Sequence, residues 1–163
     1  TGGLQEASGV APDLACFSKA LGNGVPVGCI VGRRDFLADT PVSSTFGGET
    51  TGLAAALAVL QVHATRPICQ QLWEVGKRVQ SHITTALNGS GLEVVGTPIH
   101  FRFQVPDGGD VLAVDRFLTL CAEEHVLIHR AANNVSLAMD DHGVCQTLKK
   151  SLARAVTRLL GDV

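Results

Sequence analysis

The sequence has 163 residues, 45% of them hydrophobic, and a formal net charge of −2. Its 13 basic and 15 acidic residues are interspersed and its aromatic content is 4%, a composition that argues against a nucleic-acid-binding protein. Because the longest apolar stretches fall short of the roughly 20 residues of a membrane-spanning helix and no signal-peptide pattern opens the chain, we expect a cytoplasmic protein outside any membrane.

Two short apolar segments near the start of the chain, residues 14–17 and 27–31, predict buried strands. In a parallel sheet, the side chains just past such strands face the crevice at the carboxyl edge, where ligands bind. Lys19 follows the first segment and precedes a glycine-rich turn. Burial there would disfavour the charged amine and make it nucleophilic. Lys19 is therefore either a Schiff-base lysine or, like most lysines beside such turns, a solvated loop residue.

A second motif lies at residues 43–51, Ser-Ser-Thr-Phe-Gly-Gly-Glu-Thr-Thr, directly before a predicted helix over residues 52–62. A helix N-terminus offers unpaired N–H groups and the positive end of the helix dipole, and glycines let a phosphate approach them. The motif predicts either a phosphate site or an ordinary helix start with Thr50 or Thr51 as the N-cap. The earlier glycines do not fit a dinucleotide-binding fingerprint, because their spacing is Gly-x-Gly-x-x-x-Gly and Pro26 would interrupt the following helix.

The rest of the chain alternates between helical and strand-like patterns, which favours an α/β fold. A short helical turn is expected over residues 33–38, a strand with alternating burial over 99–105, and short strands over 126–129 and 135–139. Three amphipathic helices are expected to bury one face each, the second with Asp110 as its N-cap. The expected buried residues are Leu72, Val75, Val79, Ile83 and Ala86, then Val111, Val114, Leu118 and Cys121, then Val144, Leu148, Leu152, Ala155 and Leu159.

The five cysteines form no Cys-x-x-Cys pair and lie mostly in apolar runs, so we expect buried free thiols. His125 and His129 are four residues apart, a spacing that could hold a metal on one helix. The segment between them is strand-like, and we therefore expect no metal site.

Three ordered motifs resemble the class III pyridoxal-phosphate-dependent aminotransferases, closest to the glutamate-1-semialdehyde aminomutase-like branch. They are Asp-Leu-Ala-Cys-Phe-Ser-Lys-Ala-Leu-Gly-Asn-Gly-Val-Pro-Val-Gly at 13–28, Val-Gly-Arg-Arg-Asp at 31–35 and Ser-Thr-Phe-Gly-Gly-Glu-Thr at 44–50. The resemblance covers the whole chain, most strongly residues 1–60, and Asn23 departs from it where many members carry glycine. It implies the α/β fold of fold type I PLP-dependent transferases. Residues 1–65 would be the C-terminal part of the PLP-binding large domain, and 66–163 the small α+β domain.

The resemblance also implies roles for two residues. Lys19 would be the catalytic lysine that forms the internal aldimine with pyridoxal 5′-phosphate (PLP), and Thr45 would bind the cofactor phosphate across a homodimer interface. The implied activity transfers an amino group between an amine or amino acid and a carbonyl compound. The alternative is a 2,1-aminomutase acting on a glutamate-1-semialdehyde-like substrate.

The resemblance further implies a C-terminal fragment, inactive alone, whose remaining cofactor-binding residues would lie upstream. Two other interpretations stay open. One is a truncated, inactive PLP-fold scaffold, and the other is an unrelated α/β binding domain in which Lys19 has a structural role.

Overall fold

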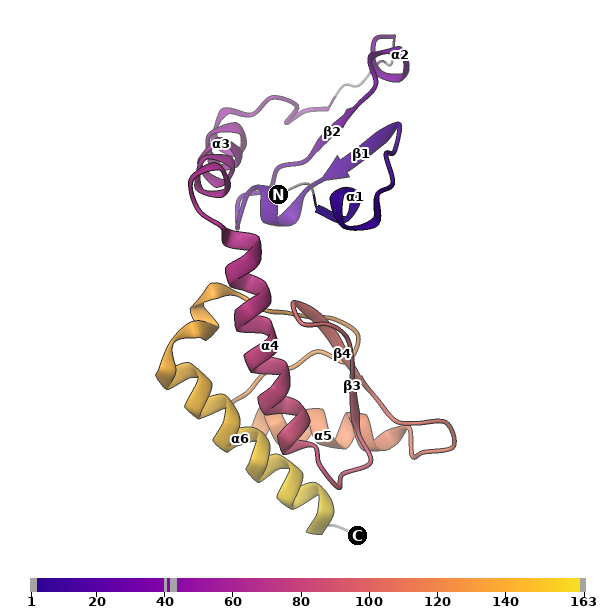
Figure 1. Cartoon of the computed structure of the whole chain (residues 1–163), viewed down its shortest axis with the longest axis vertical. Helices are drawn as coiled ribbons and strands as arrows, with labels where there is room; N and C mark the ends of the chain where they lie inside the picture. The colour runs from indigo at the N-terminus through magenta and orange to yellow at the C-terminus, as the bar shows by residue number, and fades with distance from the viewer. Residues whose placement is uncertain (1–2, 40, 42–43, 162–163) are drawn as a thin grey trace. The chain divides into compact units, whose positions relative to one another are not determined.

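The computed structural model describes residues 3–39, 41 and 44–161, and the chain divides into two compact units (Figure 1). The N-terminal unit is Thr1–Cys69 and the C-terminal unit is Gln70–Val163. This division is one of compactness, so the assignment of residues 1–65 and 66–163 to the large and small domains of a PLP-dependent enzyme stays a prediction.

The N-terminal unit contains one two-stranded sheet and several helices. Its elements are α1 (Gly3–Ser8), β1 (Leu14–Phe17), the 3₁₀ turn η1 (Lys19–Leu21), β2 (Cys29–Gly32), α2 (Arg34–Leu37) and α3 (Thr50–Thr65). Strands β1 and β2 pair antiparallel, with Leu14 opposite Gly32 and Phe17 opposite Cys29. The short helical turn expected over residues 33–38 is confirmed by α2.

The two strands expected at residues 14–17 and 27–31 are present as β1 and β2, but the expectation that they are buried in a parallel sheet is wrong in this unit. The pairing is antiparallel, and the apolar strand residues are exposed, including Phe17 at 45% and Ile30 at 49%. Their apolar composition predicted that other elements would pack on both faces of these strands, as in a parallel sheet. Within the described residues, no further strand extends this sheet.

The C-terminal unit is an antiparallel sheet packed with three long helices (Figure 1). Its elements are α4 (Ile68–Ala86), β3 (Glu93–Thr97), β4 (His100–Gln104), α5 (Leu112–Glu123), β5 (Asn133–Asn134), the 3₁₀ turn η2 (Leu137–Asp140) and α6 (His142–Gly161). The strand order is β3-β4-β5. Gly76 on α4 allows close packing here, because a Cβ atom at this position would lie 2.5 Å from the carbonyl oxygen of Pro98.

The core of the C-terminal unit follows the predicted helix and strand periodicities. On β4, Phe101 and Phe103 are buried while His100 and Arg102 are exposed, and the Phe103 ring lies 5.3 Å from that of Phe117 on α5. The helix stripes are largely confirmed by the buried Val75, Val79, Ile83, Val114, Cys121, Leu152, Ala155 and Leu159. Of the other predicted stripe residues, Leu72, Ala86, Leu118 and Leu148 are half-buried. Val111 and Val144 are exposed, at 61% and 45%, because both lie at helix starts that the core does not cover.

Two short strands expected near the C-terminus are absent from residues 126–129 and 135–139. Side-chain hydrogen bonds fold this segment into a loop instead. Nδ1 of His129 accepts from the N–H groups of Ala131 and Ala132, and the Asn133 amide bonds both the N–H and the C=O of His129. Such local bonds compete with strand pairing, so β5 is reduced to Asn133–Asn134.

The expectation of buried cysteines holds only for part of the set. Cys121 is fully buried, and burial raises the pKa of its thiol to about 12, with the nearby Glu124 carboxylate adding to the rise. Cys145 is half-buried, whereas Cys16, Cys29 and Cys69 are exposed. Cys16 and Cys29 are exposed because they lie on the uncovered β1–β2 hairpin.

Within the described part of the chain, no single helix is long and apolar enough to cross a membrane. Helices α3 and α4 meet that test only when they are taken together across the break between them.

Candidate functional site

Lys19 lies two residues after β1, at the start of η1, in a turn that the surrounding backbone holds tightly. Its φ of 51° is left-handed, a conformation that few residues other than glycine adopt. Its carbonyl accepts hydrogen bonds from the N–H groups of Gly22 (3.1 Å) and Asn23 (3.2 Å). Gly22 leaves no room for a side chain, because a Cβ atom there would lie 2.0 Å from the carbonyl oxygen of Val25. Backbone strain of this kind costs about 1–3 kcal/mol and clusters at active sites.

The Lys19 side chain is exposed, which corrects the expectation of a buried amine in a sheet crevice. The crevice was inferred from a parallel sheet, whereas β1 and β2 form an exposed antiparallel hairpin. Among residues 3–39, 41 and 44–161, the amine forms no ion pair or side-chain hydrogen bond, so it is open to a ligand. The left-handed turn is a signal that sequence reasoning did not detect at this lysine.

Thr45 lies in a pair of consecutive turns that lead into α3. The Gly47 N–H donates to the Ser44 carbonyl (3.1 Å), and the Glu49 N–H donates to the Phe46 carbonyl (3.2 Å). Thr45 is exposed within these turns. Its hydroxyl is therefore presented on a backbone that several hydrogen bonds define.

Glu49 caps α3, although the sequence predicted Thr50 or Thr51 for that position. The Thr51 N–H donates to Oε1 of Glu49 (2.8 Å), the Gly52 N–H donates to Oε2 (2.7 Å), and the Glu49 carbonyl accepts from Leu53 N–H (3.1 Å). Glutamate is not among the residues that favour the N-cap, so sequence preference missed it. Two N–H groups at the start of α3, a place where a phosphate could have bound, are therefore already bonded to a carboxylate.

The electrostatics of Glu49 follow from this cap. Its hydrogen bonds from Gly52 and then Thr51 hold the pKa of the carboxyl below its ordinary value. The negative charge is also favoured by the positive end of the α3 dipole. A phosphate near this motif would have to bind the Thr45 hydroxyl and the turn before Glu49.

Residues 26–28, which follow the Lys19 turn, lie beside the motif that contains Thr45. A pocket of about 300 Å³ is lined by residues 26–28, by the turn around Thr45 and by the start of α3. Gly52 packs there so closely that a Cβ atom would lie 3.2 Å from Cβ of Val27. Within the described residues no hydrogen bond or ion pair joins Lys19 to Thr45. One chain thus places the two predicted site residues in one unit without joining them by a hydrogen bond or ion pair among the described residues.

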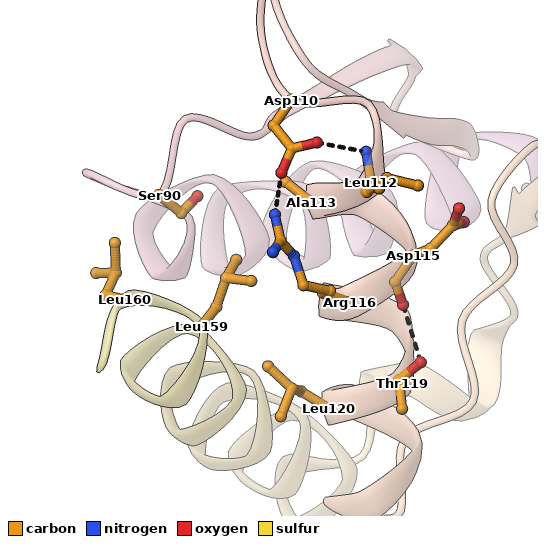
Figure 2. Close-up of a pocket in the computed structure, with 10 residues that line it drawn as sticks. All are labelled: Ser90, Asp110, Leu112, Ala113, Asp115, Arg116, Thr119, Leu120, Leu159 and Leu160. Carbon is orange, nitrogen blue, oxygen red and sulfur yellow. Dashed lines mark hydrogen bonds and ion pairs between the residues drawn. The ribbon is translucent and has the colours of Figure 1, made fainter. Parts of the chain in front are cut away.

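A separate pocket of about 590 Å³ lies between α5 and the end of α6 in the C-terminal unit (Figure 2). Leu120 and Leu159 provide apolar walls. The N-cap of α5 is Val111, so the prediction of Asp110 as the N-cap is wrong by one residue. Oδ1 of Asp110 still accepts from the Leu112 N–H (2.9 Å), and Asp110 forms an ion pair with Arg116. Asp115, which also lines this pocket, pairs with Arg130 outside it. The pocket contains neither predicted site residue.

We expect the left-handed backbone of Lys19 to lower the free energy of unfolding by an amount that substitution can measure. Replacing Lys19 with glycine removes a cost of about 1–2 kcal/mol that Lys19→Ala retains, because an L-residue is disfavoured in this conformation. Lys19→Gly should therefore unfold at higher denaturant concentration than Lys19→Ala. Ala20→Gly is the matched control and should lose about 0.5–1 kcal/mol, since its φ is ordinary. Equal stabilities of the two Lys19 variants would contradict the strain.

The Glu49 cap predicts a pH dependence of stability. Because the folded pKa lies below the ordinary value of 4.5, the stabilisation is fully present above pH 4.5 and is lost as pH falls through the folded pKa. Unfolding measured across this range should show the loss in the parent protein and in Glu49→Asp, which retains a capping carboxylate. Glu49→Gln should show a smaller pH dependence. The interpretation fails if Glu49→Gln matches the parent at every pH.

Comparison with known proteins gives a consistent result. Residues 1–144 match the family described as aminotransferase class-III. The acetylornithine aminotransferase of Streptococcus mutans is 39% identical over 82 residues, which span 48% of this chain and 22% of that enzyme. The glutamate-1-semialdehyde 2,1-aminomutase of Pelotomaculum thermopropionicum is 32% identical over 99 residues, 57% of this chain and 23% of that enzyme. The chain thus spans about a quarter of the length of these relatives.

The fold comparison covers nearly all of the chain. The structure of the FumI protein of Sphingopyxis sp. MTA144, in its PLP internal aldimine form, superposes on 97% of this chain and 39% of its own with a TM-score of 0.85 and 22% identity. This confirms the predicted PLP-dependent transferase fold. The chain belongs to the class-III aminotransferase family.

Proposed function

We propose that this protein takes part in PLP-dependent transfer of an amino group between an amine or amino acid and a carbonyl compound. The observation that carries the proposal is the position of Lys19, whose exposed amine is held on a strained left-handed turn directly after β1. A role of the turn in orienting a reacting amine would explain why a strained backbone is retained at this position. Family membership supplies the reaction class.

The residues present fit the chemistry of PLP. The cofactor has an aldehyde, which needs a primary amine, and a phosphate, which needs hydrogen-bond donors. Lys19 offers the amine and Thr45 offers an exposed hydroxyl, while Glu49 holds the Thr45 turn against α3. Bound PLP supplies an electron sink for negative charge on the substrate carbon.

Lys19 would act both as the anchor of the cofactor and as an acid and base. Its Nζ would hold the cofactor and, when not bound to it, would accept and return a proton at the substrate carbon, which is general acid–base catalysis by a positioned side chain. The left-handed turn, bonded through the Lys19 carbonyl to Gly22 and Asn23, limits the positions that this amine can reach.

Thr45 would bind the phosphate held by the other subunit of a homodimer. This arrangement agrees with the lack of contact between Lys19 and Thr45 within the described part of one chain. We also propose a cytoplasmic location, supported by five cysteines that are all unpaired.

A 2,1-aminomutase is the second candidate, favoured by the similarity to the enzyme of Pelotomaculum thermopropionicum. An aminomutase returns the amino group to the carbon skeleton from which it came, so it needs no separate acceptor. Turnover of a glutamate-1-semialdehyde-like substrate alone would favour this activity. A strict requirement for a donor and a different acceptor would favour the aminotransferase.

We predict that Lys19 is the residue to which the cofactor binds covalently. Full-length protein is incubated with PLP, reduced with borohydride and digested, and the label should lie on Lys19. Lys19→Arg should retain the charge but lose turnover, because a guanidinium stays protonated. A label on Lys77 or Lys149, with none on Lys19, would overturn the assignment.

We predict that Thr45→Val weakens cofactor affinity by about ten- to a hundredfold, because a hydrogen bond to a charged group contributes about 1.5–3 kcal/mol. Equilibrium titration with PLP measures the loss, and an unchanged unfolding midpoint would show that the fold is intact. Thr45→Ser, which retains the hydroxyl, is the matched control and should bind more tightly than Thr45→Val.

Hybrid dimers test whether Thr45 acts across the interface. Differentially tagged Lys19→Ala and Thr45→Val chains should form hybrids in which one site carries both changes and the other carries neither. Activity should then rise above that of either parent. If tagged hybrids form without any gain, while Thr45→Val alone is impaired, Thr45 acts within its own chain.

A further inference from the structure

Two of the four asparagines in the chain precede glycine, and one of these lies in the Lys19 turn. The Val25 N–H donates to the Gly22 carbonyl (3.2 Å), so Asn23 and Gly24 are the two central residues of a β-turn. Both have left-handed φ values, 47° for Asn23 and 108° for Gly24. Asn23 is therefore presented on a tight turn immediately after the proposed catalytic lysine.

The surroundings of this Asn-Gly step leave its reactive atoms accessible. Asn23 and Gly24 are both exposed, and a Cβ atom added at Gly24 would meet nothing within 4 Å. Within the described residues, the Gly24 N–H and the Asn23 side-chain amide form no hydrogen bond. No hydrogen bond among the described residues thus ties up the Gly24 nitrogen, and no side chain at Gly24 hinders the approach of the Asn23 side chain to it.

We propose that Asn23 is a site of spontaneous deamidation. Hydroxide removes the proton from the Gly24 backbone nitrogen, which attacks Cγ of Asn23. A nitrogen–carbon bond forms, the bond from Cγ to the amide nitrogen breaks, and ammonia leaves. Water then opens the five-membered succinimide at one of its two carbonyls, giving aspartate or isoaspartate. The net change consumes one water molecule, releases one ammonia and involves no oxidation.

The two asparagines that do not precede glycine show the opposite environment. Oδ1 of Asn133 accepts from the His129 N–H (2.9 Å), and its Nδ2 donates to the His129 carbonyl (2.7 Å). Oδ1 of Asn134 bonds to Nδ1 of His100 (2.8 Å). Both side chains are held by partners, and the following residues, Asn134 and Val135, carry bulky side chains that hinder their backbone nitrogens.

The modification would alter the turn that orients Lys19. Aspartate introduces a negative charge four residues after the lysine, and isoaspartate adds one methylene to the backbone of the turn. The added methylene is incompatible with the present hydrogen bonds from Asn23 to the Lys19 carbonyl and from Val25 to the Gly22 carbonyl. Loss of Lys19 reactivity on ageing is therefore expected. This consequence rests on the proposed function, whereas the deamidation itself does not.

The test uses full-length protein aged at mildly alkaline pH in water enriched in heavy oxygen, followed by tryptic digestion and mass spectrometry. The peptide of residues 20–33 should gain mass and incorporate one heavy oxygen. Residues 79–102 contain the exposed Asn88-Gly89 step and serve as the positive control, while residues 131–149 contain Asn133 and Asn134 and should stay unmodified. An unmodified 20–33 peptide in a sample whose 79–102 peptide has reacted would overturn the proposal.

Asn23→Gly is the matched variant, because glycine accepts the left-handed backbone and has no amide to lose. Its 20–33 peptide should stay unmodified, and its borohydride-trapped label on Lys19 should persist through ageing, whereas the parent loses label as deamidation proceeds. A mass gain in this peptide of the variant would place the reaction elsewhere and contradict the proposal. If the parent deamidates and keeps its label, Asn23 remains the site but its link to Lys19 is wrong.

Discussion

The geometry of the N-terminal unit depends on local backbone hydrogen bonds, because this unit buries few of its apolar side chains. Leu53, Leu57 and Leu60 are each more than half exposed, although they share one face of α3. The Lys19 turn is held instead by two bonds to one carbonyl, and the Thr45 turn is held by the Glu49 carboxylate and backbone. The positions of both proposed site residues are thus set by polar contacts close in sequence.

The C-terminal unit is organised differently, around a closed apolar core. Phe117 and Cys121 on α5 and Leu152 on α6 have essentially no exposed surface, so the core joins two separate helices. Ion pairs between α5 and α6, such as Arg154 with Glu124, lie at the edge of this core. Burial of apolar surface provides most of the stabilisation of a fold. We therefore expect loss of a single polar contact to affect the folding of this unit less than that of the N-terminal unit.

The parts of the structure that were predictable from sequence are those with a clear period. The alternation along β4 and the stripe on α4 follow directly from residue spacing, since each pattern has one buried face. β3 was not predicted, because Gly96 interrupts its short apolar run. The loop after α5 was mistaken for strands, because the competing bonds of His129 and Asn133 involve side chains whose partners cannot be read from a periodic pattern.

For the candidate site, the sequence indicated which residue types take part, but it did not indicate their local geometry. Lys19 was predicted as a candidate from its place between a strand-like run and a glycine-rich turn, and Thr45 from the family resemblance. A general expectation of free N–H groups at the start of α3 did not foresee that Glu49 binds two of them. The apolar residues of β1 and β2 also suggested burial that this chain does not supply, because the described unit contains only one exposed hairpin. The apolar composition of a strand indicates that its side chains need packing partners, but it does not indicate which part of a protein provides them.

The Lys19 turn shows how a functional requirement can oppose local stability. Lys19 and Asn23 both occupy left-handed backbone that glycine would accept at lower cost. A glycine at residue 19 would remove the only amine on the turn, so the strain there is tied to the proposed chemistry. At residue 23 no such requirement is evident, and the asparagine instead brings an amide next to an unhindered glycine nitrogen. The turn that presents the lysine is therefore also the turn in which we propose that Asn23 deamidates.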